Sequence, residues 1–335
     1  MNKLAAFYLL AWTLLAGLMP AHADIADRPD VVAFIQEIVA RRHLDALELS
    51  KLFRQAEIQR KIVESMDRPA ESKPWWEYRK ILLTEAHIEG GVEFWQHNRA
   101  ALEEAEARYG VAPEMIVAII GAESRYGQIL GNYRVIDALS TLAFEYPRRG
   151  SYFRKELEEY LLMCKEENID PAQVRGSYAG AMGMPQFMPS SYRQYAADLD
   201  GDHKSNIWTN PADAIASVAN YFAHAGWRKN ELVALPAKII GEGFKHLLEA
   251  GTNENSIAQL HGLGVEALAP VPVTEQAKLL PLETQGGPEY WLVLHNFSVI
   301  TRYNHSPLYA MAAFQLGKEI LMRRGGPQGV FVLGK

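Results

Sequence analysis

Hydrophobic residues recur every three or four positions from Ile25 to about Ala107, with many charged residues between them. Two such groups are Ile35, Ile38 and Val39, followed by Leu49, Leu52 and Phe53. This spacing places apolar side chains on one face of an α-helix. We therefore expect several short helices in an N-terminal helical domain over residues 24–107. A loop marked by Pro74 and carrying three aromatic residues is expected at residues 73–78, where the rings either pack on the core or form a rim on which sugar rings stack.

The pattern changes along the rest of the chain. Residues 108–228 are mostly helical, whereas residues 229–290 contain short β-like segments punctuated by proline, around one helical stretch. These segments are 235–240, 271–274 and 278–282. A strand at 291–294 and a helix from Pro307 to Arg323 then return to the earlier composition. The expected fold is mainly α (α+β), with a core at 108–228, a small α/β insertion at 229–290 and a C-terminal return at 291–335.

The first 23 residues have the pattern of an export signal. Lys3 precedes an apolar run from Leu4 to Met19, and Ala21-His22-Ala23 forms a small-x-small cleavage site. The alternative is a membrane anchor, but the run is shorter than the roughly 20 residues needed to span a bilayer. Leu18 stands where the cysteine of a lipid-attachment site would have to be. We expect residues 1–23 to be a signal peptide and the mature protein to be soluble.

Composition narrows the functional classes. The 335 residues are 48% hydrophobic and 22% charged, which is typical of a globular chain rather than a disordered one. The net charge of −6 argues against a nucleic-acid partner. One cysteine excludes an intrachain disulfide and Cys-rich zinc sites. That residue, Cys164, shares a predicted helical face with apolar side chains, so we interpret it as core rather than as a nucleophile.

One helix carries a carboxylate where an apolar residue is expected. Pro113 suits the first turn and Gly127 suits the C-terminal cap. The apolar stripe of this helix passes through Ile116, Ile119 and Ile120, and its next position is Glu123. Burial disfavours the ionised form, so an inward Glu123 has a raised pKa and can donate a proton near neutral pH. The alternative is a structural ion pair between Glu123 and an arginine such as Arg125.

The segment 176–191 combines small residues with hydrogen-bonding and apolar side chains. Small residues let the backbone approach another surface closely, while Ser177, Tyr178 and Gln186 supply hydrogen-bonding groups. This composition lines a cleft, or alternatively forms a tight contact between two helices.

An acidic loop follows this segment. Asp198, Asp200 and Asp202 occupy relative positions 1, 3 and 5 of a calcium-binding loop, and the backbone carbonyl of Lys204 occupies position 7. Two positions depart from that pattern: His203 replaces the usual glycine, and Thr209 replaces the usual bidentate glutamate. Asp213 can supply the missing carboxylate. We therefore predict a structural Ca²⁺ site at 198–213, with a solvated acidic turn as the alternative.

Four motifs together resemble those of the B-type lytic murein transglycosylases. They are Glu123–Gly127, the Gly180–Ser190 run, the acidic loop ending at Trp208, and Ser217–Tyr221. The resemblance covers essentially the whole mature chain and implies an exported enzyme with a lysozyme-like helical core that cleaves the glycan strands of peptidoglycan. It implies a periplasmic location, no organic cofactor and no nucleic-acid partner, with peptidoglycan glycan strands and proteins of cell-wall synthesis or division as the expected partners. The absence of a heptad run favours a monomer.

The resemblance also implies roles for individual residues. Glu123 corresponds to a single catalytic acid/base, and Ser177 to a residue that binds the adjacent sugar. Arg148 and Arg149 resemble a basic pair that meets peptide-stem carboxylates. The implied metal ligands are Asp198, Asp200, Asp202, Lys204 and Asp213. The implied glycan-cleft residues are Gln186, Phe187, Tyr221, Tyr303, Asn304, Tyr309 and Tyr78.

The hypothesis that follows is cleavage of the β-1,4 bond between N-acetylmuramic acid and N-acetylglucosamine, with formation of a 1,6-anhydro ring. One inward carboxylate suffices because an internal hydroxyl replaces water as the nucleophile. Two alternatives remain open. A hydrolytic muramidase would need a second carboxylate, for which Asp137 and Glu145 are the candidates. A non-catalytic peptidoglycan-binding protein would keep the cleft without turnover.

Overall fold

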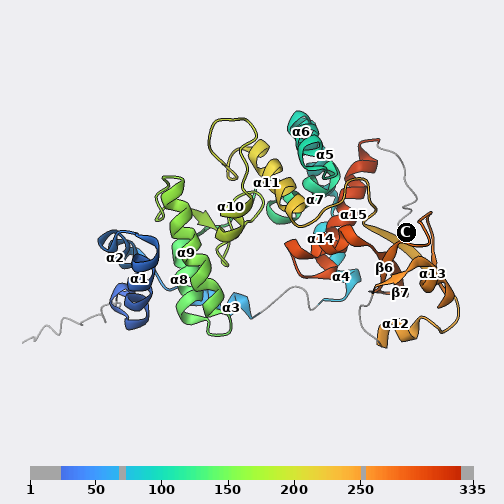
Figure 1. Cartoon of the computed structure of the whole chain (residues 1–335), viewed down its shortest axis with the longest axis horizontal. Helices are drawn as coiled ribbons and strands as arrows, with labels where there is room; N and C mark the ends of the chain where they lie inside the picture. Colours follow the sequence, from blue (N-terminus) through green and yellow to red (C-terminus); the bar gives the residue numbers. More distant parts are fainter. Residues whose placement is uncertain (1–23, 68–72, 250–253, 326–335) are drawn as a thin grey trace, which may run out of the picture. The chain divides into compact units, whose positions relative to one another are not determined.

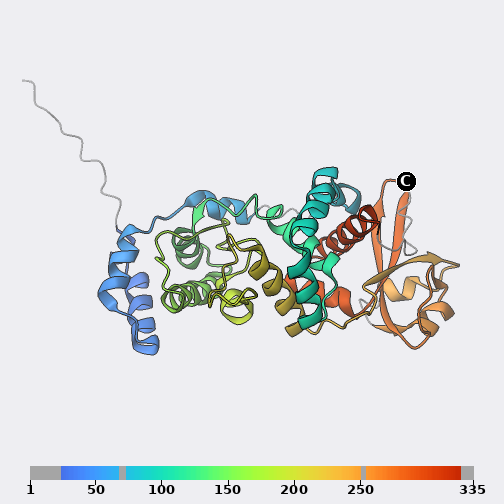
Figure 2. The same ribbon diagram turned by 90° about the horizontal axis from the view of Figure 1, so that it is seen from above.

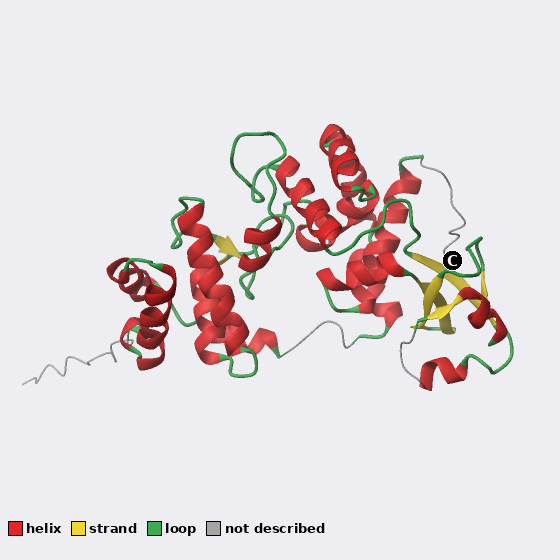
Figure 3. Cartoon of the chain, in the orientation of Figure 1, coloured by secondary structure: helices red, strands yellow, loops and turns green. Residues whose placement is uncertain are grey.

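The structure is a computed structural model that describes residues 24–67, 73–249 and 254–325. The predicted signal peptide at 1–23 lies outside the described residues. Helices dominate, and strands are confined to two small sheets (Figure 3). The chain divides into two compact units, of which the first extends to Ala56 and the second begins at Glu57. No helix within the described ranges is both long enough and apolar enough to cross a bilayer.

The first unit is a small helical cluster. Its elements are the 3-10 helix η1 (Ile25–Asp27), α1 (Pro29–Arg42) and α2 (Ala46–Gln55). The predicted helical spacing is confirmed, because Ile35 and Ile38 of α1 and Leu49 of α2 are all buried. The rings of Phe34 and Phe53 meet edge to face with centroids 6.1 Å apart.

The second unit contains all the remaining helices of the described residues, and α7 lies among several of them (Figures 1 and 2). They are α3 (Arg60–Met66), α4 (Trp75–Leu82), α5 (Glu85–His97), α6 (Arg99–Tyr109), α7 (Pro113–Ser124), α8 (Val135–Glu145), α9 (Gly150–Glu166), α10 (Pro189–Tyr195), α11 (Pro211–His224), α12 (Lys245–Glu249), α13 (Ile257–Gly262), α14 (His295–Tyr303) and α15 (Pro307–Arg323). Ile116, Ile119 and Ile120 of α7 are fully buried, and α5, α6, α11 and α15 all pack against this helix. The site at the end of α7 is therefore held by the main hydrophobic core.

The helices predicted for residues 24–107 do not share one core. Trp95 of α5 and Leu102 of α6 belong to the same buried cluster as Ile119 of α7 and Phe314 of α15. The chain divides into compact units after Ala56, and the predicted domain boundary at Ala107 stays a prediction.

The aromatic segment predicted to be a loop is helical instead. Pro74 is the N-terminal cap of α4, which begins at Trp75. Trp75 is 1% exposed and Tyr78 is 5% exposed, and the Trp75 indole donates a hydrogen bond to Glu289. Proline is favourable beside the first turn of a helix, so Pro74 starts this helix rather than preventing it.

The predicted α/β insertion contains a five-stranded antiparallel sheet with the order β4-β6-β7-β3-β5. Its strands are β3 (Ala234–Ile239), β4 (Asn255–Ser256), β5 (Val265–Ala267), β6 (Gln276–Thr284) and β7 (Gly287–Val293), while β1 (Tyr133–Arg134) and β2 (Arg175–Gly176) form a separate antiparallel pair.

Two expectations for this insertion are corrected. The segment 271–274 is not a strand but leads into a turn, since Pro272 has no N–H for a sheet ladder. The strand expected at 291–294 is the end of β7, which begins at Gly287 and pairs with both β6 and β3.

Candidate active site

Glu123 lies in the last turn of α7. The helix was expected to end at Gly127, but it ends at Ser124, and Arg125 is the C-terminal cap with φ 48°. The cap N–H of Arg125 donates to the carbonyl of Gly121 at 3.0 Å. Left-handed caps favour glycine, and here a non-glycine residue adopts that conformation five residues after the last buried isoleucine, Ile120. Glu123 therefore continues the apolar stripe while standing at the very end of the helix.

The side chain of Glu123 is half-buried, and its carboxyl has one polar partner. Burial raises the pKa of Glu123 from 4.5 to about 7, against an opposing hydrogen bond from Tyr309. The phenol of Tyr309 donates to Oε1 of Glu123 at 2.5 Å. No ion pair of Glu123 occurs within the described ranges, and Arg125 is exposed and does not contribute to the pKa shift of Glu123. Near neutral pH this carboxyl can both give and accept a proton.

The partner Tyr309 comes from α15, which approaches α7 very closely. A Cβ at Gly317 would lie 2.8 Å from the carbonyl oxygen of Glu114, so glycine allows the two helices to touch. Lys318 of α15 forms an ion pair with Glu114 at 3.1 Å. These contacts hold the helix that carries Tyr309 against the helix that carries Glu123.

Aromatic side chains predicted for the cleft gather beside this pair. The rings of Tyr303 and Tyr221 lie 4.8 Å apart, and Phe187 is 5.9 Å from Tyr221 and 6.1 Å from Tyr303. Burial first, and then the charge of Glu123, raises the pKa of Tyr303 well above its ordinary value. The hydroxyl of Tyr303 donates to the carbonyl of Pro185, and that of Tyr221 donates to the carbonyl of Arg302 at 2.7 Å. The two tyrosines are thus anchored through their hydroxyls and remain partly exposed, while Phe187 is buried beside them.

Tyr78 and Asn304 border the same cluster. Tyr78 of α4 is buried close enough to Tyr309 to contribute to the raised pKa of that phenol, although burial is the largest cause. Asn304 follows α14 and accepts a hydrogen bond from the N–H of Ser306 at 3.1 Å. Its Oδ1 therefore shapes the turn into α15, on which Tyr309 stands.

The segment 176–191 forms turns rather than a helix–helix contact. Gly131 and Gly176 are so close that a Cβ at Gly131 would collide with the carbonyl of Gly176. The hydroxyl oxygen of Ser177 accepts hydrogen bonds from the N–H groups of Ala179 at 3.2 Å and Ala181 at 3.1 Å. Because both of these bonds use its lone pairs, the hydroxyl proton of Ser177 is free to be donated to a ligand.

Gln186 joins this segment to the loop that follows Glu123. Its amide nitrogen donates to the carbonyl of Gly183 at 2.9 Å and to that of Leu130 at 3.4 Å. Gln186 has φ 49°, a left-handed conformation that is unusual for a non-glycine residue. Such strained positions persist where the surrounding structure requires them and cluster at functional sites.

The predicted basic pair is not joined to this cluster by any described interaction. Arg148 and Arg149 lie in the turn between α8 and α9. Arg148 is 79% exposed and forms an ion pair with Asp67 at 3.4 Å. Arg149 lies over the ring of Tyr152, 4.5 Å from its centroid. Their predicted contact with peptide stems stays a prediction.

The acidic loop has the conformation that a cation site needs. Oxygen atoms of Asp198, Asp200 and Asp202 all lie within 4.8 Å of one another. His203 adopts φ 66°, so the position usually held by glycine takes the required left-handed conformation without one. The two carboxylate oxygens of Asp213 accept the N–H groups of Leu199 at 3.0 Å and Asn206 at 2.9 Å. The residues therefore fit a calcium ion, with Asp213 closing the loop on itself.

The two candidates for a second catalytic carboxylate lie on α8. Both oxygens of Asp137 bind the guanidinium of Arg134, at 2.7 and 2.9 Å, and one also accepts the N–H of Glu57 at 2.9 Å. Asp137 is 4% exposed and is therefore engaged in holding α8 to the chain before α3. Glu145 is exposed at the end of α8.

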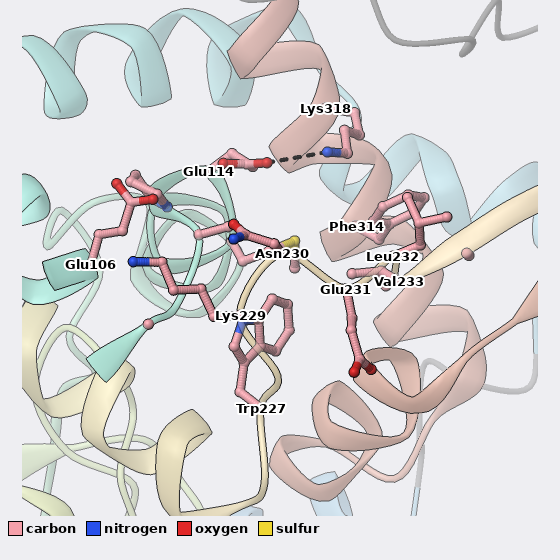
Figure 4. A pocket seen from close by; sticks show the side chains of 15 residues that line it. Glu106, Glu114, Trp227, Lys229, Asn230, Glu231, Leu232, Val233, Phe314 and Lys318 are labelled. Carbon is pink, nitrogen blue, oxygen red and sulfur yellow. Dashed lines mark hydrogen bonds and ion pairs between the residues drawn. The ribbon is translucent and has the colours of Figure 1, made fainter. Parts of the chain in front are cut away.

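A cavity of about 290 Å³ lies at the opposite end of α7 from Glu123 (Figure 4). It is lined by Glu114 and Met115 of α7, Trp227 after α11, and Phe314 and Lys318 of α15. At about 1.5 Å per residue, Glu114 and Glu123 are roughly 14 Å apart along the helix axis. This cavity is therefore separate from the candidate active site.

Sequence reasoning missed one member of the aromatic cluster. The ring of Tyr195, on α10, meets that of Tyr221 edge to face at 4.8 Å. Its sequence signal was weak because Tyr195 lies outside the motif that ends at Ser190. Its proximity to Tyr221 depends on the packing of α10 against α11, which are joined by a long loop.

Comparisons with known proteins agree with this geometry. The sequence matches the family described as Transglycosylase SLT domain over residues 26–318. It is 43% identical over 318 residues to the membrane-bound lytic murein transglycosylase B of Escherichia coli (strain K12), covering 92% of this chain and 87% of that protein.

Solved structures of this kind are also similar. The crystal structure of the soluble lytic transglycosylase SltB1 from Pseudomonas aeruginosa has a TM-score of 0.84 at 45% identity, covering 89% of this chain and 100% of that one. The Escherichia coli lytic transglycosylase Slt35 in complex with calcium has a TM-score of 0.82 at 43% identity, covering 90% of this chain and 96% of that one. A family match over most of the chain, a relative this similar and a shared lysozyme-like fold together establish that the chain belongs to the lytic transglycosylase family.

Proposed function

We propose that this chain cleaves the β-1,4 bond between N-acetylmuramic acid and N-acetylglucosamine in peptidoglycan, with Glu123 as the single acid and base. The observation that carries the proposal is the half-buried carboxyl of Glu123, whose pKa is raised to about 7 and whose polar partner is a phenol rather than a cation. Such a group is protonated often enough to act as an acid and becomes a useful base once it is ionised.

In the first step, protonated Glu123 donates its proton to the glycosidic oxygen as the bond to C1 of the muramoyl residue breaks. The positive charge that develops at C1 is stabilised by the N-acetyl group of the substrate. Tyr309 donates to Oε1 of Glu123, which leaves Oε2 to carry the proton toward the sugar. The phenol therefore selects the oxygen that performs the chemistry.

In the second step, ionised Glu123 removes the proton from the C6 hydroxyl of the muramoyl residue. The C6 oxygen attacks C1, and a 1,6-anhydro ring closes while Glu123 returns to its protonated form. The nucleophile belongs to the substrate, so orientation of the sugar supplies much of the rate enhancement. The partly exposed rings of Tyr221 and Tyr303, backed by the buried ring of Phe187, are suited to hold apolar faces of the sugar in that orientation.

The remaining cleft residues supply polar contacts. Ser177 donates its hydroxyl proton to the neighbouring sugar, and Gln186 offers its amide oxygen, since its nitrogen is engaged by two carbonyls. Asn304 presents its amide nitrogen, and Tyr78 closes the cluster behind Tyr309. Because peptidoglycan lies outside the cytoplasm, the working compartment is the periplasm.

Arg148 and Arg149 bind carboxylates of the peptide stems. Arg148 is exposed, and its partner Asp67 is itself half exposed, so a stem carboxylate can replace it. Arg148→Ala should lower turnover of peptide-bearing glycan strands and leave turnover of peptide-free strands unchanged. An equal loss on both substrates would contradict this role.

Calcium at the acidic loop has a structural role. The carboxylates of Asp198, Asp200 and Asp202 and the carbonyl of Lys204 would hold the ion, and Asp213 would complete the set through the second lone pairs of its oxygens. Bound calcium would supply positive charge that neutralises these carboxylates. The loop follows α10 directly, so this neutralisation braces the segment that carries Gln186 and Phe187.

The test is turnover of purified peptidoglycan with mass detection of the products. Wild-type protein should release products with a 1,6-anhydro terminus, each one water lighter than the hydrolytic product. Glu123→Gln should remain folded and release none, whereas Glu93→Gln, at an exposed position of α5, should match the wild type. Hydrolytic products would favour a muramidase, and substantial turnover by Glu123→Gln would contradict the assignment of the acid.

A further inference from the structure

Three consecutive residues after the end of α7 adopt left-handed backbone conformations. Their φ values are 48° for Arg125, 60° for Tyr126 and 86° for Gly127. Glycine accepts this conformation without strain, whereas Arg125 and Tyr126 do not. A strained pair immediately after Glu123 needs an anchor, because the backbone would otherwise relax and carry the end of the helix with it.

The anchor is the side chain of Tyr126, which fills a notch formed by glycines of two helices. A Cβ at Gly121 of α7 would lie 2.5 Å from Cζ of Tyr126. On α5, a Cβ at Gly90 would lie 2.9 Å from Cε2 of the same ring, and one at Gly91 would lie 2.7 Å from its hydroxyl. No real Cβ tolerates such distances, so the ring requires glycine at Gly90 and Gly121, and at Gly91 it does so together with Ile320, whose Cδ1 would lie 2.4 Å from the added Cβ.

The ring is also fixed through its edge and its hydroxyl. The hydroxyl of Tyr126 donates to the backbone carbonyl of His87 on α5 at 2.6 Å. The ring of Phe94, also on α5, has its centroid 5.5 Å from that of Tyr126. Tyr126 is thus bound to α5 while its backbone terminates α7.

Backbone hydrogen bonds link this anchor to the turn that carries Glu123. The N–H groups of Arg125 and Tyr126 donate to the carbonyls of Gly121 and Ile120, at 3.0 and 3.4 Å. The N–H of Gly127 donates to the hydroxyl of Ser124 at 3.0 Å. Glu123 lies inside this closed set of contacts, close to the negative end of the helix dipole, which disfavours its ionised form.

We propose that Tyr126, seated in the notch of Gly90, Gly91 and Gly121, is a positioning residue that holds the end of α7 so that the carboxyl of Glu123 stays in its low-water environment facing Tyr309. This proposal rests on the proposed function for the role of Glu123. The notch itself is a separate geometric observation.

The charged and titratable groups around the two residues define what a pH experiment reports. Glu123 faces Tyr309 from α15 and Tyr303 from α14. Tyr126 faces His87 from α5, and burial first, then the charge of Arg125, lowers the pKa of that imidazole. His87 accepts the Tyr126 bond through its backbone, so its ring titration does not break the anchor.

The main test is Gly121→Ala, whose Cβ displaces the Tyr126 ring from the notch. Gly262→Ala is the matched control, because it lies in α13 with nothing within 4 Å of the added Cβ. We expect Gly121→Ala to lower turnover at pH 7 by at least tenfold. We also expect the basic limb of its pH–rate profile to move down by about one pH unit, because Glu123 becomes better hydrated. Gly262→Ala should match the wild type in both respects.

Tyr126→Ala provides the background for a double-mutant cycle. Once the ring is gone, adding Gly121→Ala should cause no further loss of turnover and no further shift of the basic limb. Additive losses would mean that Gly121 acts through some other contact and would overturn the proposal. Tyr126→Phe keeps the ring and removes the bond to His87; it should show a smaller shift in the same direction, and it decides the matter if Gly121→Ala does not fold.

A direct titration separates this proposal from the proposed function. In protein with ¹³C-labelled glutamate, the side-chain carboxyl signal of Glu123 is identified by its loss in Glu123→Gln. Its midpoint should lie lower in Gly121→Ala and Tyr126→Phe than in the wild type. Unchanged midpoints in the folded variants would overturn the positioning role, whatever the activity of Glu123→Gln. Turnover by Glu123→Gln together with shifted midpoints would instead reject the proposed function and keep the notch.

Discussion

Replacing Glu123 by glutamine should stabilise the fold at alkaline pH as well as abolish turnover. Glutamine keeps the shape of the side chain and can still accept the hydrogen bond from Tyr309. It removes an acid that folding keeps protonated. Glu123 therefore lowers the stability of the fold at alkaline pH, and the site retains it for its chemistry.

The magnitude follows from the two pKa values of Glu123. The value is 4.5 for the ordinary group and about 7 in the folded protein. At about 1.4 kcal/mol per pH unit, this interval corresponds to about 3 to 4 kcal/mol. Because the folded pKa is raised, the wild type has the full contribution of protonated Glu123 below pH 4.5. It loses that contribution as the pH rises, and the loss is complete above about pH 7.

The assay is unfolding of full-length wild type and Glu123→Gln across this pH range. The two proteins should have similar stability at pH 4, whereas the variant should be more stable by about 3 to 4 kcal/mol at pH 8. At roughly 2 °C per kcal/mol for a unit of this size, the melting temperature should differ by about 7 °C at pH 8. Glu93→Gln controls for the general effect of removing one negative charge. A stability difference that is the same at pH 4 and pH 8 would refute the raised pKa.

Three further predictions concern other parts of the molecule. Tyr309→Phe removes a hydrogen bond that favours ionised Glu123, so the basic limb of the pH–rate profile should move up by about one unit; a limb that stays in place would contradict the 2.5 Å bond. Calcium at 100 times its dissociation constant should stabilise the protein by about 2.7 kcal/mol in thermal unfolding, and Asp202→Asn should weaken this effect, which magnesium should not reproduce. Gln315 of α15 is 2% exposed, and neither of its amide atoms has a hydrogen-bond partner among the residues that the structure describes, so Gln315→Met should raise the free energy of unfolding by about 1 kcal/mol in urea titration, and a loss of stability would show that the amide has an essential partner.

The sequence by itself determined the features that depend on neighbouring residues. The stripe of Ile116, Ile119 and Ile120 predicted the inward direction of Glu123, because a helix repeats its faces every three to four residues. The spacing of Asp198, Asp200 and Asp202 also acts locally. A loop of five residues can be closed by its own hydrogen bonds, and this closure brings the three carboxylates together. The strands around Leu235 and Leu280 were likewise visible in local composition.

The tertiary structure decided what touches Glu123 and where its helix ends. Tyr309 lies 186 residues further along the chain, and no local pattern could state that its hydroxyl would meet Oε1 rather than solvent. Helix α7 ends at Ser124 instead of Gly127, where the ring of Tyr126 lies among glycines of both α7 and α5. The sequence leaves Asp137 as a candidate for a second catalytic carboxylate, whereas in the structure its oxygens accept hydrogen bonds from the guanidinium of Arg134 and the N–H of Glu57. Periodicity reports which face of an element is buried, but the partner on that face is chosen by packing between segments that are distant in sequence, and a carboxyl takes its pKa from that partner.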